Sequence, residues 1–315
     1  KAKQAESNNQ ALSNLVPSNT GKAVSEKYSK DNSVSQNQTG ASALKPVTIQ
    51  SASSNKENQF VLAQLDLLLA IQESGSITAA AKAIAVSYKT AWERVDRLNN
   101  LSESPLVSRS AGGAKGGGTT LTDAGRIILT QLQHLQLQQQ AILNTRPPAS
   151  ASTDTINAGN IDLQQFIASN SVVSSARNQF LGRVLAIQPG TVNCQIKIEV
   201  SSSIELSVSI TEQSREKLAL QVNDKVIALI KASSVGLALP SRTAPVSLSS
   251  ENVFTGKVSQ LIPGAVNVDV SVALGEGKTL SAIISDQSAK QLGLEEDLEV
   301  SAFFNASNVI LLVTQ

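Results

Sequence analysis

Residues 178–193 read NQFLGRVLAIQPGTVN, and residues 252–267 read NVFTGKVSQLIPGAVN. These stretches belong to a longer internal repeat, because residues 177–239 align without a gap with residues 251–313, at an offset of 74 (251 − 177). Identical residues stand at 21 of the 63 aligned positions. The repeat predicts two copies of one small domain in tandem.

Each copy has the residue pattern of a β-domain. Apolar residues occupy every second position of the segment 192–200 and again of the segment 204–210, which is the period of strands with one buried face. Each copy has about five such short strands and one short helix, near residues 213–220 and 287–294. This is the content of a small OB-like barrel. Because sixty-odd residues form only a marginal core, we expect the copies to pair or to oligomerise.

The segment before the repeat has a helical pattern. Its apolar spacing predicts a helix over 60–72, a second from Ser76 or Thr78 to about Ala85, and a third over 87–100. Two short strands over 106–110 and 119–121 surround the glycine-rich segment 112–118, and a long helix follows over 123–143. This order predicts a winged helix-turn-helix with a long dimerisation helix.

The third helix of this motif is the expected DNA reader. Ser87 caps it, so that hydroxyl groups and backbone amides at its start can approach DNA, while the wing would contact phosphates. We expect DNA contacts from Ser87, Tyr88, Lys89, Thr90, Arg94 and Arg97 on the helix, and from Arg109 and Lys115 on the wing. The alternative is a helical bundle with solvated charges, which Glu93 and Asp96 favour. We expect Trp92 to belong to the core rather than to stack on bases.

Composition excludes several classes of function. The chain of 315 residues has 26 basic and 25 acidic residues, so its net charge of +1 does not by itself indicate nucleic-acid binding. Cys194 is the sole cysteine and His134 the sole histidine, which argues against disulfides, cation sites and a Ser-His-Asp triad. We expect Cys194 to be buried and His134 to lie at the surface. The glycine-rich segment lacks the order of a phosphate loop, so no enzyme class is supported.

The expected fold is multidomain α+β. Residues 1–57 are polar and predict a disordered extension. They are followed by a DNA-binding domain with its dimerisation helix over 58–143, a linker over 144–173 with an ordered piece near 161–167, and OB-like β-barrels over 174–240 and 249–315. Neither an apolar run of 18 residues nor a signal-peptide core is found, so we expect a cytoplasmic protein without membrane spans.

The two copies differ where charge could bind a ligand. Arg177 aligns with Glu251, and Lys231 aligns with Asn305. A dianion needs fixed positive charge together with hydroxyl and amide donors, because burying it unpaired is costly. The first copy therefore predicts an oxyanion site, and the second copy is expected to be largely structural. The alternative is that Arg177 and Lys231 are ordinary surface charges.

Several motifs of the chain resemble one family. SARNQF at 175–180, GTVN at 190–193, ITEQS at 210–214 and IKAS at 230–233 resemble the molybdate-binding Mop (molbindin) domain. SYKTAW at 87–92, VDRLNN at 95–100 and GGAKGGG at 112–118 resemble the LysR-like winged helix of molybdate-dependent transcriptional regulators. The resemblance covers about 60–143 and 174–315.

This resemblance implies a homodimer that binds molybdate, or tungstate, between modules at the boundary of two chains. Carried over by motif position, the expected ligands are Ser175, Arg177, Thr211, Ser214 and Lys231, with Ser233 and the backbones of Ala176 and Ala232 as weaker candidates. It further implies that the liganded form binds operator DNA and represses molybdate-uptake genes. One alternative is a molybdate storage or buffering protein without DNA binding. Another is a LysR regulator of a small organic effector, against which the duplicated β-module argues.

Overall fold

The computed structural model describes residues 56–109, 118–144, 162–240 and 248–313. All the described residues belong to one compact unit. The extension predicted over 1–57 therefore lies outside the described residues, apart from Lys56 and Glu57, which begin the first helix. The tip of the wing, residues 110–117, also lies outside them.

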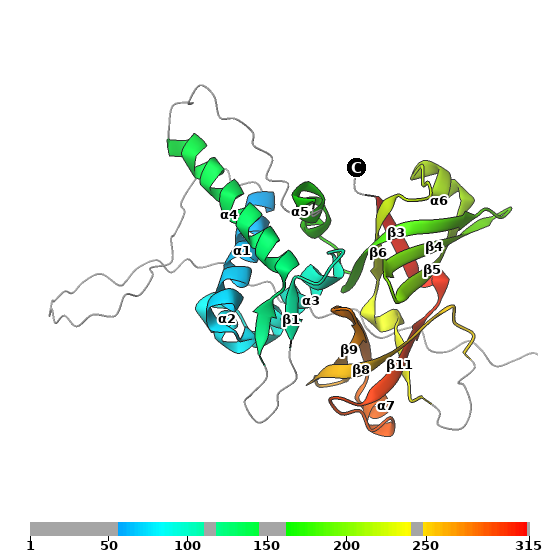
Figure 1. The fold of residues 1–315 in the computed structure, drawn as a ribbon. Helices are drawn as coiled ribbons and strands as arrows, with labels where there is room; N and C mark the ends of the chain where they lie inside the picture. Colours follow the sequence, from blue (N-terminus) through cyan, green and yellow to red (C-terminus); the bar gives the residue numbers. More distant parts are fainter. Residues whose placement is uncertain (1–55, 110–117, 145–161, 241–247, 314–315) are drawn as a thin grey trace, which may run out of the picture. The chain divides into compact units, whose positions relative to one another are not determined.

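The N-terminal half of the described chain has the elements of a winged helix-turn-helix, as the sequence predicted. These are α1 (Lys56–Ser74), α2 (Ile77–Ala83), α3 (Tyr88–Asn100), β1 (Val107–Arg109), β2 (Thr119–Leu121) and α4 (Asp123–Asn144). The two strands pair antiparallel, with Val107 opposite Leu121. Side chains buried inside the motif include Leu68, Ile71, Ala91, Val95 and Ile128. Figure 1 shows α1 and α4 beside each other, in blue and green.

The turn between α2 and α3 has a simple local cause. Ala85 adopts a left-handed conformation with φ of 55°, which redirects the chain after α2. The Ser87 hydroxyl then accepts the backbone N–H of Thr90 at 3.0 Å and caps α3. The cap proposed from the sequence is thus confirmed. At the start of α4, the Thr122 hydroxyl accepts the Gly125 N–H in the same way, at 3.0 Å.

One further helix, α5 (Leu163–Ser171), follows the segment 145–161. Its start is capped by Asp162, whose carboxylate accepts the N–H groups of Gln164 and Gln165. Phe166 on this helix is buried against the helical core. The ordered piece expected within the linker is therefore longer than predicted, and it packs on the winged helix.

The repeat forms two curled, five-stranded antiparallel sheets, which confirms the expected α+β class with OB-like modules (Figure 1). The first copy supplies β3 (Asn178–Gln188), β4 (Asn193–Ser201), β5 (Ile204–Thr211), α6 (Glu212–Lys217), β6 (Lys225–Ile230), a 3-10 turn η1 (Ala232–Ser234) and β7 (Gly236–Ala238). The second supplies β8 (Asn252–Pro263), β9 (Asn267–Gly275), β10 (Lys278–Ser285), α7 (Asp286–Gln291), β11 (Glu299–Phe304), η2 (Ala306–Asn308) and β12 (Val309–Val313).

The two copies exchange their last strands. The sheet order is β12-β6-β3-β4-β5 in one module and β10-β9-β8-β11-β7 in the other. The C-terminal strand β12, red in Figure 1, thus pairs with β6 of the first copy, with Val309 opposite Ile230. In return β7 pairs with β11, with Ala238 opposite Ser301. The modules of the structure are therefore not the same as the copies of the sequence.

A shared core and two equivalent asparagines join the modules further. Phe180 and Ile196 of the first copy share one buried cluster with Phe304 and Leu311 of the second. The Asn178 amide pairs with the backbone of Ser281, at 2.8 and 2.7 Å. Asn252 pairs with the backbone of Ser207 in the same way, at 2.8 Å in both directions. Since 178 + 74 = 252 and 207 + 74 = 281, the copies are bound by one reciprocal contact made twice.

Backbone packing explains a repeated glycine. A Cβ atom at Gly182 would lie 2.4 Å from the Ile198 side chain, and one at Gly256 would lie 2.5 Å from the Ala273 carbonyl oxygen. Both positions thus need glycine, because adjacent strands approach too closely for a side chain. Cys194 is fully buried and His134 is exposed, as predicted.

Candidate anion site and nucleic-acid interface

The positive residues proposed for the anion lie at one end of the first module. The ladder between β3 and β6 ends with Asn178 opposite Ile230. The next residues of the two chain segments are Arg177 and Lys231, so both leave the sheet at the same edge. Ser175 and Ser233 are exposed, two residues further along each segment. Four of the six expected ligand residues are thus grouped at this end of β3 and β6, which we call the positive edge.

The other two expected ligands lie elsewhere in that copy. Thr211 caps α6 by accepting the Ser214 N–H at 3.1 Å, and the two hydroxyl oxygens are 2.8 Å apart. Thr211 pairs with Asn193 at the start of β4, whereas Arg177 precedes the start of β3, which runs antiparallel to β4. The hydroxyl pair therefore lies at the opposite end of β3 from Arg177. A single copy does not bring all six residues together.

The second copy offers an equivalent hydroxyl pair on the side of the positive edge. Arg177 is paired with Asp269, which lies opposite Ile283 in the ladder of β9 and β10, and β10 ends two residues later at Ser285. Ser285 and Ser288 repeat the geometry of Thr211 and Ser214, with hydroxyl oxygens 2.8 Å apart. They were missed as site candidates, although their alignment with Thr211 and Ser214 could have found them.

The second copy also has an internal carboxylate at the position equivalent to Arg177. The Glu251 carboxylate accepts the backbone N–H of Ala306 at 2.9 Å, and this hydrogen bond lowers the pKa of Glu251. Ala306 is the equivalent of Ala232 in the first copy. A turn of this sequence can therefore donate its amide to an anionic oxygen, and in the second copy that oxygen belongs to the protein.

Arg177 contacts two carboxylates in the structure. Its guanidinium is paired with Asp269 on β9, and it lies 3.1 Å from Glu93 on α3. Two thirds of the Arg177 side chain is covered, with 31% exposed. A residue selected as an anion ligand thus already binds oxyanions, here side-chain carboxylates of the same chain.

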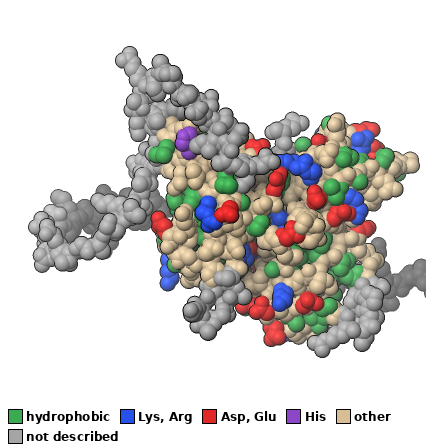
Figure 2. Space-filling view, viewed as in Figure 1, with side chains coloured by type: hydrophobic (Ala, Val, Ile, Leu, Met, Phe, Trp, Pro, Cys, Tyr) green, Lys and Arg blue, Asp and Glu red, His purple; other side chains and the backbone are tan. Residues whose placement is uncertain are grey.

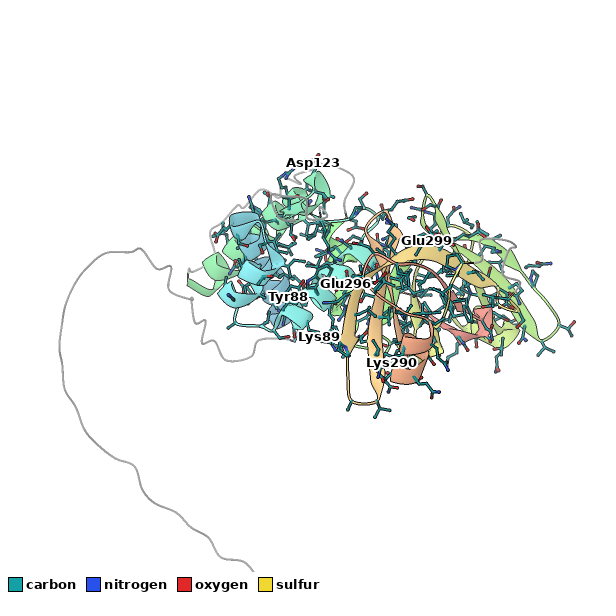
Figure 3. All side chains as sticks on the ribbon, turned by 90° about the horizontal axis from the view of Figure 1, so that it is seen from below. Tyr88, Lys89, Asp123, Lys290, Glu296 and Glu299 are labelled. Carbon is teal, nitrogen blue, oxygen red and sulfur yellow. The ribbon has the colours of Figure 1, made fainter. Side chains whose placement is uncertain are left out.

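The start of α3 presents some of the residues proposed for DNA. Ser87 and Tyr88 are exposed, and Figure 3 shows Tyr88 and Lys89 at this end of the helix. The Tyr88 and Trp92 rings meet in a T-shaped arrangement, with their centroids 5.9 Å apart. Lys89 lies 3.3 Å from Asp269 and 3.8 Å from Glu93. The Thr90 hydroxyl is 2.7 Å from that of Ser87.

Two of the three arginines proposed for DNA contact groups of the same chain. Arg97 donates to the carbonyl oxygens of Asn170, at 2.9 Å, and of Val172, and burial lowers its pKa. Arg109 pairs with Asp96 and lies 4.0 Å above the Trp92 ring, where a cation interacts favourably with the aromatic face. Arg94 is half-buried, and Lys115 lies outside the described residues. The DNA roles of these residues stay predictions.

Trp92 belongs to the helical core in part, as expected, because it packs against the buried cluster of the winged helix.

Figure 2 shows lysine and arginine side chains interspersed with aspartate and glutamate on the face in view. Within the described ranges, no group of three histidine, cysteine or acidic side chains could hold a metal ion. Likewise, none of the described helices is both long and apolar enough to cross a membrane.

Comparisons with known proteins agree with this architecture. Residues 62–126 match the bacterial regulatory helix-turn-helix protein, lysR family, and residues 174–237 and 248–311 each match the TOBE domain. The chain is 38% identical over 252 residues to the molybdenum transport protein ModE of Azotobacter vinelandii, covering 79% of this chain and 91% of that protein. It is 34% identical over 251 residues to the DNA-binding transcriptional dual regulator ModE of Escherichia coli K12, with 79% and 91% covered.

A solved structure of the cytoplasmic molybdate-binding protein ModG, with molybdate bound, is 34% identical in sequence, with a TM-score of 0.43. The match covers 45% of this chain and 99% of that one. The matches to the two ModE proteins span 252 and 251 residues, and this chain covers 91% of the length of each. The chain therefore belongs to the ModE family of transcriptional regulators.

Proposed function

We propose that this protein is a molybdate-sensing, DNA-binding transcription regulator that acts as a homodimer in the cytoplasm. The order of a winged helix before two TOBE modules supports this function, as do relatives named as transcriptional regulators. We infer that it is not an enzyme. Its liganded form would bind operator DNA and repress the genes for molybdate uptake.

The observation that carries the anion proposal is the positive edge of the first module. Arg177 and Lys231 leave β3 and β6 together, and the turn after Lys231 begins with the same two residues, Ala-Ser, as the turn that binds the Glu251 carboxylate in the second copy. Two fixed positive charges and an amide suit a tetrahedral dianion such as molybdate or tungstate. The hydroxyl donors Thr211 and Ser214 lie at the other end of their copy, which supports completion of the site by a second module or a second chain.

The function is tested by DNA binding with and without the anion. We expect fluorescence anisotropy on the DNA upstream of molybdate-uptake genes to show tight binding that increases with molybdate. Sulfate should act much more weakly, because it is the smaller anion. Anion binding without any DNA binding would instead favour a storage protein, and binding of neither ligand would refute the proposal.

The ligand assignment is tested by making the first copy like the second. Arg177→Glu places a carboxylate where Glu251 stands in the second copy, and it should abolish molybdate binding in isothermal titration calorimetry. Arg183→Glu is the matched control, since Arg183 is exposed on β3, the strand that follows Arg177, and its variant should bind like the wild type. Undiminished binding by Arg177→Glu would contradict the assignment.

A further inference from the structure

The C-terminal end of α3 is held by the start of β10. The Asn100 amide pairs with the backbone of Thr279, donating at 2.7 Å and accepting at 2.9 Å. Lys278 donates to the carbonyl oxygens of Asn99, Asn100 and Ser102, at 2.9, 3.4 and 2.6 Å. All these side chains are buried. We call this contact the clamp. Beside it, the Thr279 hydroxyl donates to the Asp96 carboxylate at 3.2 Å, and that carboxylate is also paired with Arg109.

The N-terminal end of the same helix meets a second contact of different chemistry. Lys89 and Glu93 of α3 approach Arg177 of the first copy and Asp269 of the second, which we call the charge cluster. Arg177 is paired with Asp269 and lies 3.1 Å from Glu93, and Lys89 lies 3.3 Å from Asp269. Figure 3 shows Lys89 at the end of α3, on the side of the second copy. Lys89 and Glu93 are both more than 40% exposed, so water and solutes can reach this end.

Asp269 contacts both cations of the charge cluster. Its side chain is 13% exposed, and its Oδ2 atom contacts both Lys89 and Arg177. Its Oδ1 atom is buried and accepts no hydrogen bond from the described residues. The aligned residue in the first copy is Gln195, which carries no charge. The cluster is thus a feature of one face only, the face that carries Arg177.

A dianion and these carboxylates would compete for one guanidinium. A tetrahedral dianion on Arg177 would lie within a few ångströms of Glu93 and Asp269, and like charges at such separations repel strongly where water is partly excluded. A bound anion therefore favours a state in which the carboxylates have moved away from Arg177. The clamp itself pairs amide, ammonium and carbonyl groups, and the nearby Asp96 carboxylate is already neutralised by Arg109, so the clamp stays closed.

We propose that, without the anion, Glu93 and Asp269 bind Arg177 and hold the first turn of α3 against the second module. Anion binding displaces the two carboxylates from Arg177 and thereby frees this turn. This inference rests on the proposed function. The exchange also frees Lys89 from Asp269, so that its ammonium can bind a DNA phosphate. The anion thereby raises DNA affinity, and by linkage DNA raises anion affinity equally.

The experiment uses the full-length protein and two conservative variants, Asp269→Asn and Glu93→Gln. Calorimetric titration with molybdate, without DNA, should show affinity raised by about 5- to 50-fold in each, because no carboxylate has to be displaced. Glu205→Gln is the matched control, since Glu205 is half-exposed and paired with Lys197, and it should leave the affinity unchanged. Glu93 lies in the DNA-binding domain, outside the β-modules. A change in molybdate affinity in Glu93→Gln without DNA therefore reports the contact between Glu93 and Arg177.

A second measurement separates exchange from a simple change in local charge. In the wild type molybdate should increase DNA affinity several-fold, and in Asp269→Asn this gain should shrink, because Lys89 is already released from Asp269. Wild-type molybdate affinity in both variants would overturn the proposal. A raised affinity with an unchanged gain in DNA binding would overturn it too. Failure of the wild type to bind molybdate at all would instead refute the proposed function.

Discussion

A buried ammonium group joins the DNA-binding domain to the second β-module. Lys278 is 1% exposed, and its three acceptors are backbone carbonyl oxygens at the end of α3. Lys278→Met would leave these buried carbonyl oxygens without a donor. This cost outweighs what is gained by no longer burying a charge, so we expect a loss of about 2–3 kcal/mol in the free energy of unfolding. Urea denaturation measures it. Lys290→Met is the control, since that side chain is 75% exposed and should change stability by less than about 0.5 kcal/mol.

The same lysine predicts a dependence of stability on pH. Burial lowers the pKa of Lys278 from 10.5 to about 8. Between pH 8 and 10.5 the unfolded chain holds a proton that the folded protein has lost, so this group makes the free energy of unfolding rise with pH. Below pH 8 both states are protonated and the contribution is constant. The stability of the wild type relative to Lys278→Met should therefore grow from pH 8 to 10.5, and a flat or falling difference would contradict the assigned pKa.

Single residues were predictable from the sequence where their environment is local. The Ser87 cap depends on residues three positions apart, and the burial of Cys194 follows from the alternation within its own strand. The partners of Arg177 were not predictable, because Glu93 and Asp269 are separated from it by 84 and 92 positions (177 − 93 and 269 − 177). From the sequence, Glu93 and Asp96 indicated only a less basic helix surface. In the structure Glu93 binds Arg177 and Asp96 binds Arg109.

At the scale of elements, the exchange of β7 and β12 predicts that one copy cannot fold as a monomer. The fragment 174–240 lacks β12, which supplies the buried residues Val309 and Leu311 beside β6, and its own β7 has no β11 to pair with. We expect it to be unfolded when dilute and to gain structure only on self-association, since β7 of one fragment can complete another. Circular dichroism at several concentrations, with sedimentation, measures this. The fragment 174–315 is the control and should unfold cooperatively as a monomer. A folded monomer of 174–240 would contradict the exchange.

The alternating pattern could give the strands but not this exchange. An aligned repeat predicts the same strands whether each copy keeps its last strand or lends it to the other, because both arrangements bury the same faces. The long helix α4 and the paired strands of the wing were predictable for the opposite reason, since their neighbours in space are neighbours in sequence. The helix α5 was underestimated, because its buried contact is made through Phe166 with a core far along the chain.

At the scale of the whole molecule, the proposed function is that of a homodimer. Two chains of 33.0 kDa give 66.0 kDa (2 × 33.0). The described part of α4 buries Ile128, Leu129 and Leu132 in its own domain, but Leu137 near its end is 63% exposed. We therefore expect Leu137 to contact the partner helix in the dimer.

Leu137→Glu should place a charge in that contact and convert the 66.0 kDa dimer into the 33.0 kDa monomer in light scattering. Gln138→Glu is the matched control, because Gln138 is the exposed neighbour on the same turn and adds the same charge. The monomer should retain a folded helical core, since the buried residues of α4 are untouched, but it can engage only one half-site and should lose DNA affinity by at least tenfold. A Leu137→Glu protein that stays dimeric at micromolar concentration would place the dimer contact elsewhere, and the modules would then be the next surface to test.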